Sequence, residues 1–204
     1  MMRLKGSVLS SLAVAALMAG SSVMAAPVIG EPAPSFEVVG SDGETWSLQG
    51  LEGKTVVLEW TNHECPFVVK HYGPENMQSL QREAAEHEVV WLSVISSAPG
   101  KQGHLSAEQA NALSAERNAS PATVLLDESG DMGRAYGART TPQMAVIDTD
   151  GILRYMGGID SIPSANPADI ERADAYFANA MAAVLSGQDP DPAVSTPYGC
   201  SVKY

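Results

Sequence analysis

"KTVVLEWTNHECPFVVKHY" (residues 54–72) joins an apolar, β-branched run to a cysteine that stands directly before a proline. The run predicts a buried central strand, because strands covered on both faces read as continuous apolar segments. Pro66 predicts the first turn of a helix, where its missing N–H has no partner to lose. We therefore expect a central strand, a short loop and a helix whose N-terminal edge carries Cys65.

Strands and helices are predicted on both sides of this stretch. Asp-Gly pairs at 42–43 and 150–151 stand between apolar runs and predict two hairpins. The remaining pattern predicts helices over 66–86, 106–118 (opened by a capping box of Ser106 and Gln109) and 166–186, strands over 89–96 and 122–127, and a helical turn over 130–138. This order predicts an α/β fold with a mixed central sheet, helices on both of its faces, an N-terminal β-hairpin and an extended C-terminal tail.

The N-terminal segment has the layout of a cleaved secretory signal. Two basic residues precede an apolar run over 8–19, and small residues lead to a predicted cut after Ala25. The run is too short to span a bilayer, so we expect no membrane anchor after cleavage. The predicted organisation is a signal peptide (1–25), one domain (26–187) and a tail (188–204), in a protein exported to the periplasm or secreted.

The net charge bears on possible partners. The 204 residues carry a formal net charge of −12. Nucleic acid and anionic lipid are bound by clustered lysine and arginine, so neither is an expected partner. An exported chain with two cysteines meets conditions in which a disulfide persists.

Cys65 has the position of a reactive thiol. A thiolate is the nucleophile, and the N–H groups and dipole of a helix N-terminus favour it. Glu64 opposes this effect, whereas a protonated His63 would add to it. The expected result is a modestly lowered pKa; an inert cysteine packed in the core is the alternative.

Two further features lie on neighbouring predicted strands. Glu59 interrupts the apolar central strand; buried without a partner it would have a raised pKa and suit a proton carrier, whereas at a solvated strand end it would pair with Lys54. Thr141-Pro142 opens another apolar strand and is compatible with a cis peptide bond near another site.

Together these residues resemble the thioredoxin-like superfamily, and most closely its exported redoxin branch of peroxiredoxin-like and thiol-disulfide reductase-like proteins. The resemblance covers about residues 31–187. Cys65 matches the first active-site cysteine, Glu59 the acidic position on the preceding strand and Thr141-Pro142 the cis-proline loop. It implies a thioredoxin-like fold and a thiol-dependent oxidoreductase without a cofactor, which acts on a peroxide or protein disulfide and is restored by an external thiol reductant.

The chain departs from the resembling families at several positions. Val68 replaces the second cysteine of a CxxC motif, and Asn62 stands where peroxiredoxins carry threonine. The arginine of peroxiredoxins is replaced by Pro142, with Arg139 three positions away. The resemblance leaves as candidate substrate-binding residues Asn62, His63, Arg139, Thr141 and Pro142.

The second cysteine, Cys200, lies near the end of the tail, in "YGCSVKY" (198–204). This Gly-Cys end resembles that of a subgroup of peroxiredoxin-like proteins. The leading interpretation is that Cys200 resolves an intermediate on Cys65 as a disulfide, within a monomer or across a homodimer. A structural disulfide in a non-enzymatic binding module is the alternative; closing a loop of 135 positions would stabilise the fold by ~5 kcal/mol. A copper carrier built on His63, Cys65 and His71 is a third reading, although no second cysteine is close in sequence.

Overall fold

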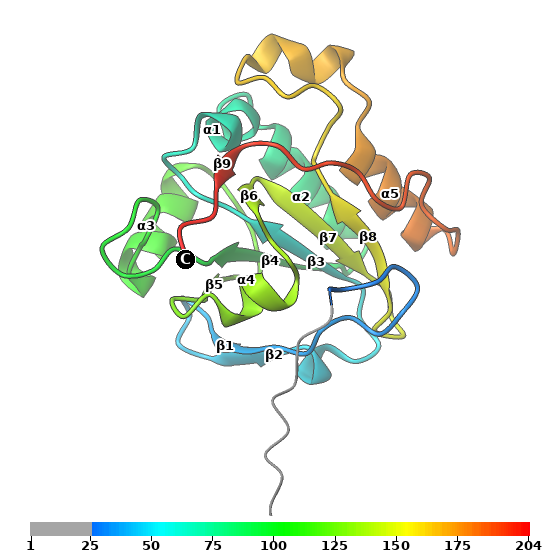
Figure 1. The fold of residues 1–204 in the computed structure, drawn as a ribbon, viewed down its shortest axis with the longest axis horizontal. Coiled ribbons are helices and arrows are strands. Elements are labelled where there is room, and N and C mark those ends of the chain that lie inside the picture. Colours follow the sequence, from blue (N-terminus) through cyan, green and yellow to red (C-terminus); the bar gives the residue numbers. More distant parts are fainter. Residues whose placement is uncertain (1–25) are drawn as a thin grey trace, which may run out of the picture.

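The computed structural model of the protein describes residues 26–204. Its centre is a five-stranded mixed sheet with strand order β5-β4-β3-β7-β8 (Figure 1). The strands are β3 (Val56–Trp60), β4 (Val90–Ile95), β5 (Thr123–Leu126), β7 (Gln143–Ile147) and β8 (Leu153–Gly157). β3 lies in the middle, parallel to β4 and antiparallel to β7. The predicted α/β, thioredoxin-like architecture is confirmed.

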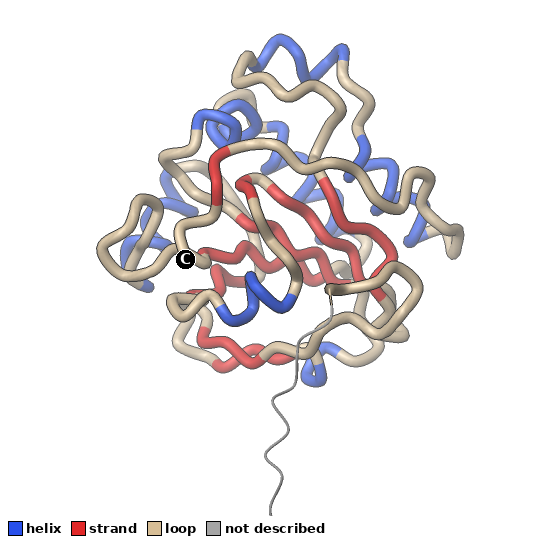
Figure 2. Tube along the Cα trace, in the orientation of Figure 1, coloured by secondary structure: helices blue, strands red, loops and turns tan. Residues whose placement is uncertain are grey.

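Helices cover both faces of this sheet (Figure 2). One face packs against α1 (Pro66–Tyr72), α2 (Asn76–Glu86) and α5 (Tyr176–Leu185) in a core that includes Val57, Met144 and Phe177. α3 (Ala107–Glu116) packs beside β5. The other face is covered by α4 (Asp131–Ala135) and the N-terminal segment. All five residues of β3 are buried, as expected of a doubly covered central strand.

Both predicted hairpins and the capping box are present. β1 (Glu37–Val39) pairs antiparallel with β2 (Thr45–Ser47), and a short 3₁₀ helix, η1 (Gln49–Leu51), follows. β7 pairs antiparallel with β8. The Ser106 side chain accepts the Gln109 N–H while the Gln109 side chain accepts the Ser106 N–H, which opens α3 as predicted.

Two of the predicted helices are each divided. The predicted helix over 66–86 breaks between α1 and α2, where Pro74 has no N–H to continue the ladder and Glu75 adopts a left-handed φ of 60°. The predicted helix over 166–186 is a 3₁₀ helix, η2 (Pro167–Arg172), followed by α5. Between them Asp174 exchanges two hydrogen bonds with Ser161, which replace helical ones.

The C-terminal tail runs across the molecule, passes beside α1 and ends near α4, where the Arg134 guanidinium lies over the Tyr204 ring (Figure 1, red). The extended tail also forms a short strand, which its polar, proline-rich sequence does not predict: β9 (Cys200–Ser201) pairs antiparallel with β6 (Thr140–Thr141), with Cys200 opposite Thr141. The tail forms a strand here because its backbone pairs with the N–H and C=O groups of β6, which would otherwise have no strand partner on that side.

The predicted signal, residues 1–25, lies outside the described residues. Within residues 26–204, no helix is long and apolar enough to cross a membrane.

Candidate active site

Cys65 is the N-cap residue of α1, with Pro66 in the first helical turn. Its side chain is 0% exposed and packs in the apolar core between the sheet and α1. The thiol donates a hydrogen bond to the Thr141 carbonyl oxygen, with 3.2 Å between Sγ and O. The predicted cis peptide bond between Thr141 and Pro142 is present. The structure therefore brings the first cysteine and the predicted cis-proline loop into direct contact.

Cys200 lies against Cys65 although 135 positions separate the two residues. The Cys200 backbone N–H donates to the Cys65 Sγ at an N···S distance of 3.4 Å. Both cysteines are free thiols, so the predicted disulfide is not formed in this structure. The contact lies within one chain.

The two thiols have opposite acidities. Burial raises the pKa of Cys65, but hydrogen bonds from the Cys200 side chain, the Cys200 N–H and the Val68 N–H outweigh it and leave that pKa lowered. Burial, together with the hydrogen bond to Cys65 and its charge, raises the pKa of Cys200 to about 11. Cys65 is therefore the better nucleophile of the pair in the reduced state.

Glu59 is fully buried, 0% exposed, on the central strand. Its carboxylate accepts hydrogen bonds from the Tyr72 hydroxyl (2.8 Å), Trp91 Nε1 (2.9 Å) and the Ser93 hydroxyl (3.0 Å). Burial raises the pKa of Glu59, and these hydrogen bonds offset part of the effect. The alternative of a solvated carboxylate paired with Lys54 is thereby wrong.

Glu59 is linked to a small cavity rather than to Cys65. Its donors Tyr72 and Ser93 line a cavity of about 30 Å³, together with His63 and Arg117. The volume suits a water molecule. Tyr72 also packs in the same apolar cluster as Cys65, so it lies between the carboxylate and the cysteine's surroundings.

The other predicted site residues fall into two groups, of which the first shapes the loop before Cys65. The Asn62 side chain is buried; its Oδ1 accepts the Glu64 N–H at 3.0 Å. Burial lowers the pKa of His63, which stays neutral at neutral pH and does not add the positive charge expected of a protonated ring. Its carbonyl accepts a hydrogen bond from Arg117.

The second group lies on the loop that pairs with the tail. Arg139 is exposed, its N–H donates to Gln143 Oε1 at 3.0 Å, and its carbonyl accepts the Val202 N–H. The buried Thr141 Oγ1 has no hydrogen-bond partner. The structure thus brings Thr141 and Pro142 to Cys65, and places Arg139 on the outer side of the same loop.

The residues proposed for copper do not gather. His71 Nδ1 faces the Asn76 amide at 3.0 Å, and its Nε2 lies 3.6 Å from Asp160 Oδ2. Across residues 26–204 there is no group of three or more His, Cys, Asp or Glu side chains placed to hold a metal ion.

The cis-proline loop lies against the sulfur of a cysteine at a helix N-terminus, and the strand before that cysteine carries a buried carboxylate. The model of the AhpC/TSA family matches residues 29–156. The chain belongs to this family. Membership supports a thiol-based redox function and places the protein among thioredoxin-like redoxins. The matched range includes Glu59, Cys65 and the Thr141-Pro142 bond but ends before the tail, so it does not bear on Cys200.

Solved structures share the fold. A hypothetical protein of Sinorhizobium meliloti is 22% identical, with a TM-score of 0.72 over 88% of this chain and 96% of that one. A conserved protein of Geobacillus kaustophilus is 24% identical, with a TM-score of 0.69 over 87% and 92%. A candidate protein disulfide isomerase of Bacteroides thetaiotaomicron is 17% identical, with a TM-score of 0.54 over 78% and 91%. A search of the curated proteins found no match.

Two contributors to the site were missed from the sequence. Lys70 and Asp160 lie buried next to the tail and hold Tyr198, two residues before Cys200. A lysine within an apolar helix start was the available signal. Nothing in the local pattern indicated that residues 70, 160 and 198 meet.

Proposed function

We propose that the protein is a peroxiredoxin-like thiol oxidoreductase in which Cys65 attacks the oxidant and Cys200 resolves the intermediate. The observation that carries this proposal is the docking of Cys200 on Cys65, with the Cys200 N–H 3.4 Å from the Cys65 sulfur. The lowered pKa of Cys65 and the raised pKa of Cys200 support the assignment of attacking and resolving roles.

With a hydroperoxide, the Cys65 thiolate attacks the terminal oxygen. An S–O bond forms as the O–O bond breaks, the sulfur is oxidised to a sulfenic acid, and the released alkoxide takes up a proton to leave as an alcohol. The hydrogen-bond donors around the Cys65 sulfur stabilise the thiolate before the attack.

Resolution follows from the loss of charge at Cys65. The Cys65 thiolate is one cause of the raised pKa of Cys200, and a neutral sulfenic acid removes that contribution. The Cys200 thiol then loses its proton and its sulfur attacks the Cys65 sulfur. The S–S bond forms, the S–O bond breaks, and the departing hydroxide combines with the proton as water. A second subunit is not required, because the contact is intramolecular.

A protein disulfide is the other proposed substrate class. Cys65 would attack one sulfur and release the other as a thiolate, and Cys200 would then displace the first thiol from the mixed disulfide. With either substrate, an external dithiol reductant reopens the Cys65–Cys200 disulfide and is itself oxidised. We place hydroperoxide first, because Cys65 has no exposed surface beneath the tail and a small oxidant needs the smaller opening.

In this proposal the remaining predicted residues have supporting roles. Glu59 exchanges protons with the small cavity through Tyr72 and Ser93. Thr141 and Pro142 form the wall against which the substrate lies when the tail moves, and Arg139 supplies an exposed positive charge at its rim. Asn62 and His63 shape the loop before Cys65.

Export is proposed on the composition of residues 1–25. Expression of the full chain in a bacterium, followed by mass determination of the product in the periplasmic fraction, tests this. A mature N-terminus at Ala26 is expected, and an uncut chain retained in the cytoplasm would contradict it.

The proposed chemistry is tested by trapping the intermediate. Reduced wild type, Cys200→Ser and Cys65→Ser are each treated with one equivalent of hydrogen peroxide and a sulfenic-acid reagent, and their peptides are identified by mass spectrometry. Wild type should give the Cys65–Cys200 disulfide, Cys200→Ser should give a labelled Cys65, and Cys65→Ser should give neither. An unlabelled Cys65 in Cys200→Ser, repeated with a protein disulfide as the oxidant, would overturn the proposal in favour of a structural disulfide.

A further inference from the structure

Lys70 is a lysine with almost no exposure, 1%, on the helix that begins at Cys65. Its ammonium group donates to Asp160 Oδ2 at 2.7 Å, to the Ile162 carbonyl at 3.0 Å and to the Tyr198 hydroxyl at 2.9 Å. An ammonium group has three donors, so every one of them is used. A buried charge of this kind is costly unless it is fully paired, which points to a specific role for the cluster.

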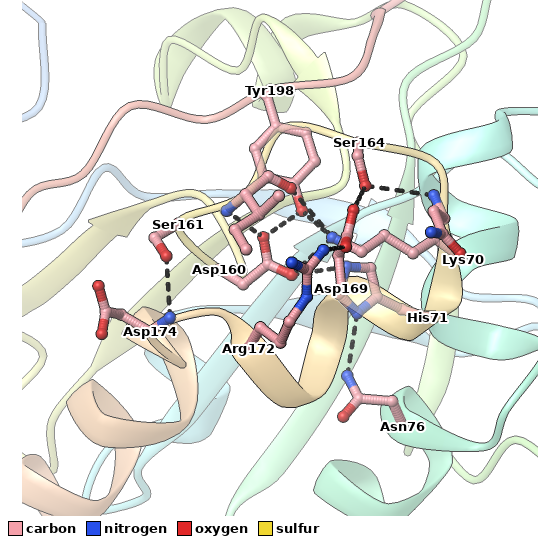
Figure 3. Close-up of polar contacts among 12 residues, drawn as sticks. Lys70, His71, Asn76, Asp160, Ser161, Ser164, Asp169, Arg172, Asp174 and Tyr198 are labelled. Carbon is pink, nitrogen blue, oxygen red and sulfur yellow. Dashed lines mark hydrogen bonds and ion pairs between the residues drawn. The ribbon is translucent and has the colours of Figure 1, made fainter.

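The three side chains form a closed triangle (Figure 3). The Tyr198 hydroxyl accepts from Lys70 and donates to Asp160 Oδ1, while the other oxygen of Asp160 pairs with Lys70. Asp160 Oδ1 also accepts the Ile162 N–H at 3.0 Å, which holds its loop in place. Neighbouring His71 is neutral at neutral pH, because burial lowers its pKa to about 4. Lys70 is therefore the positively charged partner of the Asp160 carboxylate.

The triangle connects the tail to the helix that carries the nucleophile. Tyr198 stands two residues before Cys200, and its ring also packs edge-on against Phe67 of α1, with 5.7 Å between ring centroids. Cys65 caps α1 and Lys70 lies within it, so the tail is bound to the same helix that carries the attacking sulfur. Between Tyr198 and Cys200, Gly199 passes so close to Thr141 that a side chain has no room.

We propose that Lys70 and Asp160, acting through Tyr198, are positioning residues that hold Cys200 against Cys65 and so favour closure of the disulfide between them. This inference rests on the proposed function, since it assumes that the two cysteines join. None of the three residues it adds touches the oxidant. Asp160 and Tyr198 also lie outside the segment matched by the family model.

Tyr198→Phe is the direct test, because it removes the hydroxyl and keeps the ring that packs on Phe67. Tyr204→Phe is the matched control: its hydroxyl also ties the tail to the domain, through the Ala138 carbonyl at 2.6 Å, but downstream of Cys200. Each reduced protein is equilibrated in a glutathione series, and the fraction of Cys65–Cys200 disulfide is counted by thiol labelling. The alkylation rate of Cys65 in the reduced protein is measured beside it.

We expect Tyr198→Phe to lower the equilibrium constant for disulfide closure about tenfold and to raise the alkylation rate of Cys65 by a similar factor, as loss of a hydrogen bond to charged groups implies. Tyr204→Phe removes a hydrogen bond to a neutral carbonyl and should change either quantity by about fivefold at most. If Tyr198→Phe does not fold, Asp160→Asn, which keeps the side-chain shape, takes its place. Unchanged closure in Tyr198→Phe, or equal losses in both variants, would overturn the positioning role. Failure of wild type to form the disulfide would overturn the proposed function instead.

Discussion

Gly199→Ala should detach the end of the tail from the site. Gly199 has a φ of 140°, and a Cβ placed there would stand 2.8 Å from the Thr141 carbonyl carbon and closer still to its oxygen. The atoms it meets belong to backbone, which cannot turn aside as a flexible side chain can. β9 must therefore move off β6, and the Cys200 N–H is then withdrawn from the Cys65 sulfur.

The size of the effect follows from the contacts that are lost. The backbone conformation alone costs an alanine ~1–3 kcal/mol. Separation of the strands removes hydrogen bonds of the tail, each with a net value of ~1 kcal/mol. The free energy of unfolding should fall by ~2–4 kcal/mol, which in a chain of this size lowers Tm by roughly 4–16 °C. Because Cys200 no longer donates to the Cys65 sulfur, the pKa of Cys65 should rise.

Gly187→Ala is the matched control. Gly187 also has a left-handed φ, 70°, but nothing lies within 4 Å of the point that a Cβ would occupy. It should lose only the ~1–2 kcal/mol of left-handed backbone and leave the pKa of Cys65 unchanged. Urea unfolding and the pH dependence of Cys65 alkylation measure both quantities. A Gly199→Ala protein with the stability and Cys65 acidity of the Gly187→Ala control would refute the reasoning.

Three further predictions concern buried titratable groups and the sulfur's donors. Burial raises the pKa of Glu59 above the ordinary value of 4.5, so the wild-type protein should lose stability as pH rises through that raised pKa, whereas Glu59→Gln should not. Urea unfolding measures the stability of both proteins across pH, and equal slopes of stability against pH would contradict this. Burial lowers the pKa of His71 from 6.5 to about 4, so the contribution of His71 to stability is present above pH 6.5 and lost as pH falls through about 4. His71→Gln should lose less stability than the wild-type protein over that interval in the same urea experiment, and an equal loss of stability would count against this prediction. Cys200→Ser removes the thiol and keeps the backbone N–H that donates to Cys65, so the pKa of Cys65 should rise less than in Gly199→Ala. Alkylation of Cys65 across pH measures this pKa in both variants, and a larger rise in Cys200→Ser would mean that the backbone N–H contributes little.

Much of the fold follows from short windows of sequence. The apolar run at β3, the Asp-Gly turns and the Ser106–Gln109 capping box each encode a local structure in a few neighbouring residues, and each is found in the structure. The helix breaks were missed for physical reasons. At Pro74 the apolar periodicity continues across a missing N–H, and at Asp174 the helix is interrupted by hydrogen bonds to Ser161, which is distant in sequence.

The site was predictable only where a residue carries its own local signal. Cys65 before a proline and Glu59 within an apolar strand stand out in the sequence, and the structure places both as expected of those signals. The docking of Cys200 and the Lys70–Asp160–Tyr198 triangle depend on contacts between distant segments. A polar tail indicates an extended conformation but does not show where on the surface it binds, because that is decided by the partner groups it meets.

The most direct test of the account is the equilibrium reduction potential of the Cys65–Cys200 disulfide in the wild-type protein lacking residues 1–25. It is measured by thiol counting across a glutathione or dithiothreitol series. A redox-active pair predicts a disulfide that forms and opens reversibly at a potential above about −270 mV, as in proteins that exchange disulfides. A potential below about −300 mV, typical of structural disulfides, would contradict the account and leave Cys65 and Cys200 as a permanent link between the tail and the domain.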